Sequence, residues 1–195
     1  MSTPKVFVDN MVVNALLESL YDVLDKDGKR SVLSFAKLEN ELMADKLPDG
    51  AYPHAKFLKI MESMKQLMAF SQDLLKEIGK KFAIYLNPFG TDFEQFLHVL
   101  NESFGPTEFH LQKSDADNPD LRKFEIQIKN CPFLDNDRYI EGVCQFFSGM
   151  FSEGLKKAHG GHTSVDYELS VDQGQVCDFL ITWSKQQLKD EEKEI

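Results

Sequence analysis

No run of apolar residues in this sequence reaches the roughly 18 that a membrane-spanning helix needs, and its opening residues, MSTPKVFVDN, lack the apolar stretch of a secretory signal. Basic residues are also few, because 22 Lys and Arg stand against 32 Asp and Glu and give a formal net charge of −10. Sequence-independent binding to nucleic acid depends on basic side chains that neutralise phosphates. These absences predict a cytoplasmic protein without a membrane span and without a nucleic-acid partner.

Cysteine is scarce as well. The 195 residues include 3 cysteines at irregular spacing, which favours reduced thiols over a disulfide framework.

No stretch rich in Pro, Gly or Ser divides the chain, and no internal repeat occurs. We therefore expect one domain over residues 1–195, with a helical part at 1–105, a sheet with one helix at 106–183 and a polar tail at 184–195.

Common catalytic motifs are missing. The phosphate-binding patterns GxxxxGK[ST] and GxGxxG and the metalloprotease pattern HExxH do not occur. Ser152 stands one residue too far from Gly149 for a nucleophile elbow. The spacing places no histidine where it would activate Cys144 or Cys177 as a nucleophile. The sequence therefore predicts that the chain is not an enzyme.

Phenylalanine is abundant by contrast, with 16 Phe and 7 Met beside 1 Trp. Aromatic and thioether side chains at helical spacing are typical of a packed core, and they also form the walls of cavities for apolar ligands. Both interpretations stay open at this point. In the second, a small apolar or aromatic ligand would contact five wall residues, Phe93, Phe96, Phe147, Met150 and Phe151, with His98 and Tyr167 as polar anchors.

Hydrophobic periodicity predicts the order of the elements. Apolar residues at helical spacing indicate helices at residues 8–25, 31–42, 53–82, 91–104 and about 142–155. Alternating patterns indicate strands at residues 107–113, 121–129, 163–170 and 176–183. Thr91 or Asp92 is a suitable N-cap for the fourth helix. The expected fold class is α+β, in which N-terminal helices pack against a C-terminal antiparallel sheet of about four strands with an intervening helix.

The stretch from Phe124 to Trp183 resembles the 4-vinyl-reductase-like domain family. The resemblance is carried in order by an alternating strand, Cys131-Pro132-Phe133, Cys144, the glycine-spaced helix from Gly149 to Leu155, Gly160-Gly161, Glu168, Gly174 and Cys177-Asp178-Phe179. That family shares its α+β fold with subunits of the TRAPP vesicle-tethering complex and, more distantly, with heme nitric-oxide/oxygen binding domains. Its members are regarded as small-molecule binding modules.

The resemblance implies a metal site. In phenol-sensing members, cysteines and a glutamate hold zinc beside the pocket, and Cys144, Glu168 and Cys177 match three of those ligands by position. The fourth ligand should be a cysteine three residues after the glutamate, where this chain has Val171. Asp172, His159 or His162 are the residues left to complete a four-coordinate site. Alternatively the cysteines are small buried hydrophobic residues.

Heme is the second cofactor that the resemblance raises. The heme domains carry their iron-binding histidine on the helix that corresponds to residues 92–104, and a Tyr-x-Ser-x-Arg motif after it. Alignment on the start of that helix puts Asn101 at the ligand position, one turn away from His98, and the Tyr-x-Ser-x-Arg motif does not occur.

Three functions follow from these observations. The first is a small-molecule sensor with an apolar pocket that signals to a separate effector protein through a shift between two packings of its helices. The second is a TRAPP-like interaction module that forms a homodimer or larger assembly without a ligand. The third is a heme-based gas sensor.

Overall fold

The computed structural model of the chain describes residues 6–43, 46–68, 71–87, 90–118, 120–133, 144–170 and 176–185, so the predicted tail lies almost wholly outside the described residues. The helices are α1 (Asn10–Phe35), α2 (Glu39–Leu42), α3 (His54–Met68), α4 (Gln72–Leu86), α5 (Phe93–Ser103) and α6 (Cys144–His159). The strands are β1 (Phe7–Asp9), β2 (Ala51–Pro53), β3 (Glu108–Asn118), β4 (Leu121–Lys129), β5 (His162–Ser170) and β6 (Val176–Ser184).

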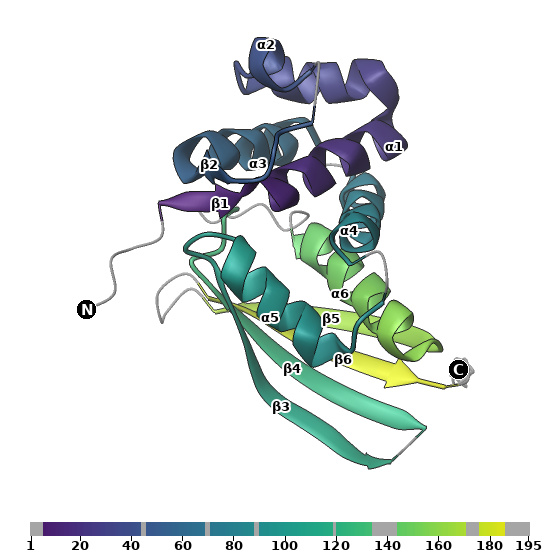
Figure 1. The fold of residues 1–195 in the computed structure, drawn as a ribbon. Helices are drawn as coiled ribbons and strands as arrows, with labels where there is room; N and C mark the ends of the chain where they lie inside the picture. The colour runs from purple at the N-terminus through teal and green to yellow at the C-terminus, as the bar shows by residue number, and fades with distance from the viewer. Residues whose placement is uncertain are drawn as a thin grey trace.

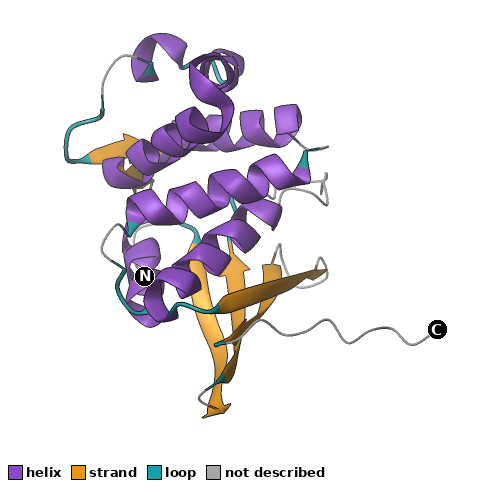
Figure 2. Cartoon of the chain, turned by 90° about the vertical axis from the view of Figure 1, so that its right-hand side faces the viewer, coloured by secondary structure: helices purple, strands orange, loops and turns teal. Residues whose placement is uncertain are grey.

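The predicted α+β class is confirmed. The four longer strands form an antiparallel sheet in the order β3-β4-β6-β5. Figure 1 shows α5 and α6 lying on one face of this sheet, with α1 to α4 beyond them. The same division into helices and sheet is visible from the side in Figure 2. Among the described residues, no helix is both long enough and apolar enough to cross a membrane.

Aspartate side chains begin α1 and then interrupt it. The Asp9 carboxylate accepts a hydrogen bond from the backbone N–H of Met11 at 2.7 Å, which caps the helix start. Asp25 has φ 62° and ψ −170°, outside the helical region, and its carboxylate accepts from the backbone N–H groups of Asp27 and Gly28. The predicted end of the first helix near residue 25 is therefore a kink, after which the chain re-enters a helix at once.

The expected single helix over residues 53–82 is two helices. α3 ends at Met68 and α4 begins at Gln72, and the backbone N–H of Ser71 bonds to the carbonyl of Met68 at 2.8 Å in the turn between them. Apolar residues continue at helical spacing across the break because both helices bury the same kind of face, so periodicity alone could not locate it. The short pair β1–β2, which joins Phe7 to Pro53, was also not predicted.

Two glycines let α4 and α6 approach very closely. A Cβ atom added to Gly149 of α6 would stand 2.0 Å from the carbonyl oxygen of Lys76, and one added to Gly79 of α4 would stand 1.9 Å from that of Phe146. Each helix therefore rests directly on the backbone of the other. Because α4 also packs on α1, this crossing ties the helix that lies on the sheet to the N-terminal helices.

The N-cap expected for α5 is Asp92, whose carboxylate accepts from the backbone N–H of Gln95 at 2.9 Å. The cap fixes the start of α5 and places Phe93 and Phe96 on its buried face, 2% and 0% exposed. These two rings begin the aromatic interior that lies between α5, α6 and the sheet.

Candidate ligand-binding region

Phenylalanine rings fill the space between α5, α6 and the inner face of the sheet. Phe147 of α6 lies at its centre, with ring centroids 5.3 to 6.5 Å from those of the phenylalanines at 104, 109, 133, 146, 151 and 179. Most of these pairs meet edge to face, the arrangement that aromatic quadrupoles favour. The rings come from α6, from the end of α5, from β3 and β6, and from the segment after β4.

The structure brings the five predicted wall residues into this one cluster. Phe96, Phe147, Met150 and Phe151 are 0% exposed and Phe93 is 2% exposed. A cavity that admitted water would give accessible surface to the side chains around it, so no such space touches the four fully buried residues. In this conformation the region is a closed core, and a ligand among these side chains would have to displace them. Their ligand-binding role stays a prediction.

Of the two predicted polar anchors, Tyr167 lies at the edge of the aromatic cluster. Its ring is 5.7 Å from that of Phe179, which in turn contacts Phe151 at 5.3 Å. The Tyr167 hydroxyl accepts a hydrogen bond from the side-chain amide of Gln145 in α6 at 3.4 Å. This half-buried residue of β5 therefore joins the sheet to α6.

His98 does not lie with the other predicted residues. Its side chain is 58% exposed, and its Nε2 atom is 3.3 Å from a carboxylate oxygen of Glu102 one turn further along α5. The buried face of the helix is formed instead by Phe93, Phe96, Leu97 and Leu100. The apolar stripe of α5 was predicted correctly, but His98 lies on the other side of it.

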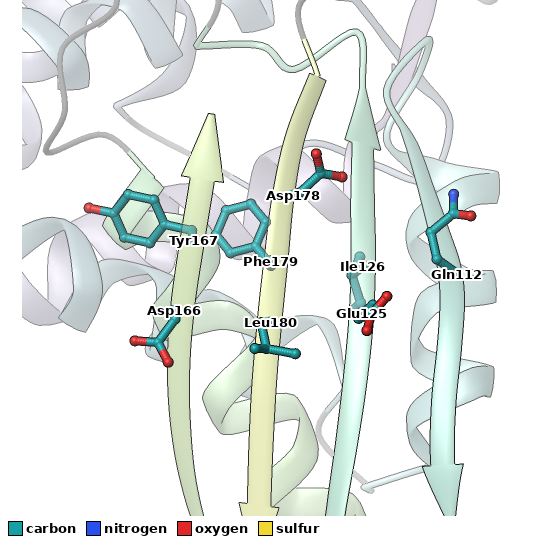
Figure 3. Close-up of a pocket in the computed structure, with 8 residues that line it drawn as sticks. All are labelled: Gln112, Glu125, Ile126, Asp166, Tyr167, Asp178, Phe179 and Leu180. Atoms are coloured by element: carbon teal, nitrogen blue, oxygen red, sulfur yellow. The ribbon is translucent and has the colours of Figure 1, made fainter. Parts of the chain in front are cut away.

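A groove of about 560 Å³ opens in the sheet beside Tyr167, and sequence reasoning did not predict it. It is shown in Figure 3 and is lined by Gln112, Glu125, Ile126, Asp166, Tyr167, Asp178, Phe179 and Leu180. Alternation along the strands explains this mixture, because Glu125, Asp166 and Leu180 are exposed while Ile126 and Phe179 are buried. Asp178 is held by the side-chain amide of Gln127 at 3.1 Å. The exposed side chains of the groove are therefore mainly acidic, and Leu180 is the exposed apolar residue among them.

The expected zinc set of Cys144, Glu168 and Cys177 is not supported. No group of three His, Cys, Asp or Glu side chains among the described residues has the geometry to hold a metal ion. The side chain of Glu168 itself and the whole of Asp172 lie outside the described residues.

The two histidines that were left to complete a zinc site lie at the wrong end of the hairpin. His162 pairs with Ser184 at the start of β5, whereas Cys177 is near the start of β6, seven residues away along that strand. At about 3.4 Å per residue, the separation far exceeds the reach of a shared metal ion. His159 belongs to the same end, where its ring lies against that of Trp183 with centroids 5.8 Å apart.

Cys144 and Cys177 nevertheless lie together, and the third residue in the group is Cys131 instead of Glu168. Cys131, Cys144 and Cys177 are all buried and free of disulfides. Contact with Cys131 is the main cause that raises the pKa of the Cys177 thiol, although a hydrogen bond from Cys144 acts in the opposite direction. Cys131 was visible in the sequence as the start of the Cys-Pro-Phe motif, but nothing in its spacing indicated this contact.

Comparison with solved structures identifies the fold. An oxygen-binding H-NOX domain related to soluble guanylate cyclases matches with a TM-score of 0.58 and 16% identity, over 89% of this chain and 93% of that one. A Tt H-NOX variant matches with a TM-score of 0.61 and 16% identity, over 95% and 99%. The Fe(II) unliganded H-NOX protein from K. algicida matches with a TM-score of 0.57 and 14% identity, over 93% and 99%.

The chain therefore has the H-NOX fold. No protein-family model matches it, and no curated protein does. The heme nitric-oxide/oxygen binding domains were expected from the sequence only as distant relatives, and the comparisons show their fold. Membership of the vinyl-reductase or TRAPP families stays a prediction.

Heme is the group that this fold suggests, and the described residues at the expected site do not fit it. Asn101 stands at the predicted iron-ligand position, but its amide donates to the carbonyl of Phe109 at 2.9 Å and accepts from the same residue's N–H at 2.7 Å. Heme iron takes His, Cys, Met or Tyr ligands, and an amide engaged on both sides has no atom to offer. The described side chains around Phe147 are fully buried in this conformation, so a macrocycle among them would have to displace them.

Proposed function

We propose that this chain is a sensor domain that uses the H-NOX fold without heme and binds a small molecule where the groove meets the aromatic interior, at Tyr167. The observation that carries the proposal is the position of this side chain. It lines the groove, contacts Phe179 at 5.7 Å and accepts a hydrogen bond from Gln145 of α6. A ligand that shifts the Tyr167 ring would therefore act on the sheet and on α6 together.

The ligand class follows from the lining of the groove. The exposed side chain of Leu180 and the half-buried ring of Tyr167 offer apolar surface that suits an aliphatic or aromatic body. The carboxylates of Glu125 and Asp166 favour a neutral or positively charged group over an anion. We therefore expect a small, mainly apolar molecule, and an amine in preference to an acid.

The response would travel through α6. The ring centroid of Phe179 lies 6.3 Å from that of Phe147 and 5.3 Å from that of Phe151, both in this helix. Gly149 lets the same helix lie against the backbone of α4. A ligand that binds one packing of α6 better than another shifts the population toward it, and a separate protein would respond to the new surface. This route needs no iron and no covalent step.

Native mass spectrometry with metal analysis tests the proposal. Protein purified without denaturation should carry one small organic molecule per chain, without iron or zinc. Tyr167→Ala should lose that molecule. The control variant Tyr21→Ala should retain it, because this substitution removes the same kind of side chain from a position on α1 that is 51% exposed.

Two outcomes would contradict the proposal. A protein that shows only its own mass, or a multiple of it, would support the interaction module instead. A bound mass equal to heme together with one iron per chain would support the heme-based gas sensor instead, and one of the matched structures is named as an oxygen-binding domain.

A further inference from the structure

The three thiols of this chain meet in the interior, although they belong to separate elements. Cys177 lies in β6 and pairs with Ile128 of β4, and Cys131 follows three residues after Ile128. Cys144 is the first residue of α6. Cys131, Cys144 and Cys177 are 4%, 2% and 1% exposed. The proposed function uses none of them.

Cys177 is the central member of the group. Its thiol interacts with those of both Cys131 and Cys144, and the interaction with Cys131 is the larger. That interaction and burial both raise the pKa of Cys177, so this residue keeps its proton near neutral pH. Thiols in contact are the starting geometry for a disulfide, and the absence of a three-ligand metal arrangement among the described residues leaves a pairwise reaction as the simplest chemistry.

We propose that Cys131 and Cys177 are a redox modification site, at which a hydroperoxide converts the two thiols into a disulfide. The Cys131 sulfur attacks one peroxide oxygen, the O–O bond breaks, and the proton that the Cys131 thiol loses goes to the departing oxygen, which leaves as water or an alcohol. This leaves a sulfenic acid on Cys131. The sulfur of Cys177 then attacks the sulfur of Cys131, the S–O bond breaks, and the Cys177 proton leaves with the hydroxyl as water.

The order of the two residues follows from their environments. All three residues are buried, and Cys131 is the least buried of them at 4% exposed, so we place the first reaction with the oxidant there. Cys177 lies in contact with Cys131, so it is the residue that reacts with the oxidised sulfur. The two electrons that the pair of thiols loses reduce the peroxide, and no metal or other cofactor takes part.

The disulfide would act on the same helix that the proposed ligand acts on. Phe133 lies two residues after Cys131, and its ring contacts those of Phe146 and Phe147 in α6 at 5.8 and 5.7 Å. A bond from Cys131 to β6 fixes the segment that carries this ring. Oxidation would therefore hold α6 in its present packing and stabilise the fold, because a crosslink restricts the unfolded chain.

Hydrogen peroxide added to the native protein tests the proposal. We expect a mass loss of about 2 Da that dithiothreitol reverses, since a disulfide removes two hydrogen atoms. Peptide mapping of the wild-type protein should identify the Cys131–Cys177 linkage. The melting temperature should rise by roughly 5–10 °C on oxidation.

Serine variants give the matched controls. Cys131→Ser and Cys177→Ser should abolish the mass loss, and Cys144→Ser should retain it. The wild-type peptide map decides the matter even if a variant fails to fold. A folded protein that loses no mass under peroxide, or a map in which Cys144 replaces either partner, would overturn the proposal. Neither readout involves a ligand, so this result is independent of the proposed sensing function.

Discussion

Gly149→Val is expected to prevent folding, or to lower the free energy of unfolding by more than about 4 kcal/mol, a loss that only a few mechanisms produce. The first atom of the new side chain would lie 2.0 Å from the backbone oxygen of Lys76. A backbone atom cannot rotate away as a side chain does, so α6 would have to separate from α4. Urea unfolding followed by circular dichroism measures the loss.

Lys156→Val is the matched control, because it places the same β-branched residue on an exposed position of the same helix. It should cost no more than about 1 kcal/mol, the scale of helix propensity and surface effects. If the two valine variants were equally stable, the α4–α6 crossing would not be as close as described here.

Phe147→Ala is expected to lower the free energy of unfolding by about 3–5 kcal/mol, the range for removing a buried phenylalanine. The ring is 0% exposed and lies among phenylalanines from α6, β3 and β6. Its removal should also leave an apolar cavity that stays dry and accepts benzene, as engineered cavities with similar linings do. Chemical denaturation with and without benzene measures both effects.

Phe35→Ala removes the same ring from a position that is 50% exposed at the end of α1. This control should change stability by no more than about 0.5 kcal/mol and should not respond to benzene. A Phe147→Ala variant as stable as the wild type would show that the interior already contains free space, which would restore the open pocket that the sequence suggested.

The fold was predictable to the extent that each element carries its own periodic signal. The strands over 121–129 and 163–170 match β4 and β5 closely, because in each the more buried residues alternate with exposed ones. The break between α3 and α4 was missed, since both helices are apolar on one side and the chain between them carries no proline. The role of Gly79 in the helix crossing could not be predicted either, because the backbone that it contacts, at Phe146, is distant in sequence.

The candidate site was less predictable because its features depend on contacts distant in sequence. The phenylalanines of α5 and α6 were singled out correctly as one cluster, yet composition cannot tell a lined cavity from a filled core. Asn101 was recognised at the iron-ligand position, but only the structure shows its amide bound to the start of β3. The groove at Tyr167 and the contact of Cys131 with Cys177 both arise from the pairing of β4, β5 and β6, which the sequence does not specify.

Titration of the purified protein with hemin, followed by absorption spectroscopy, is the most direct test of a sensor with the H-NOX fold but without heme. We expect a colourless protein in which added hemin gives only the broad spectrum of the unbound pigment, and an Asn101→Ala variant that behaves in the same way. A sharp Soret band that saturates at one hemin per chain and changes when carbon monoxide is added would contradict the account.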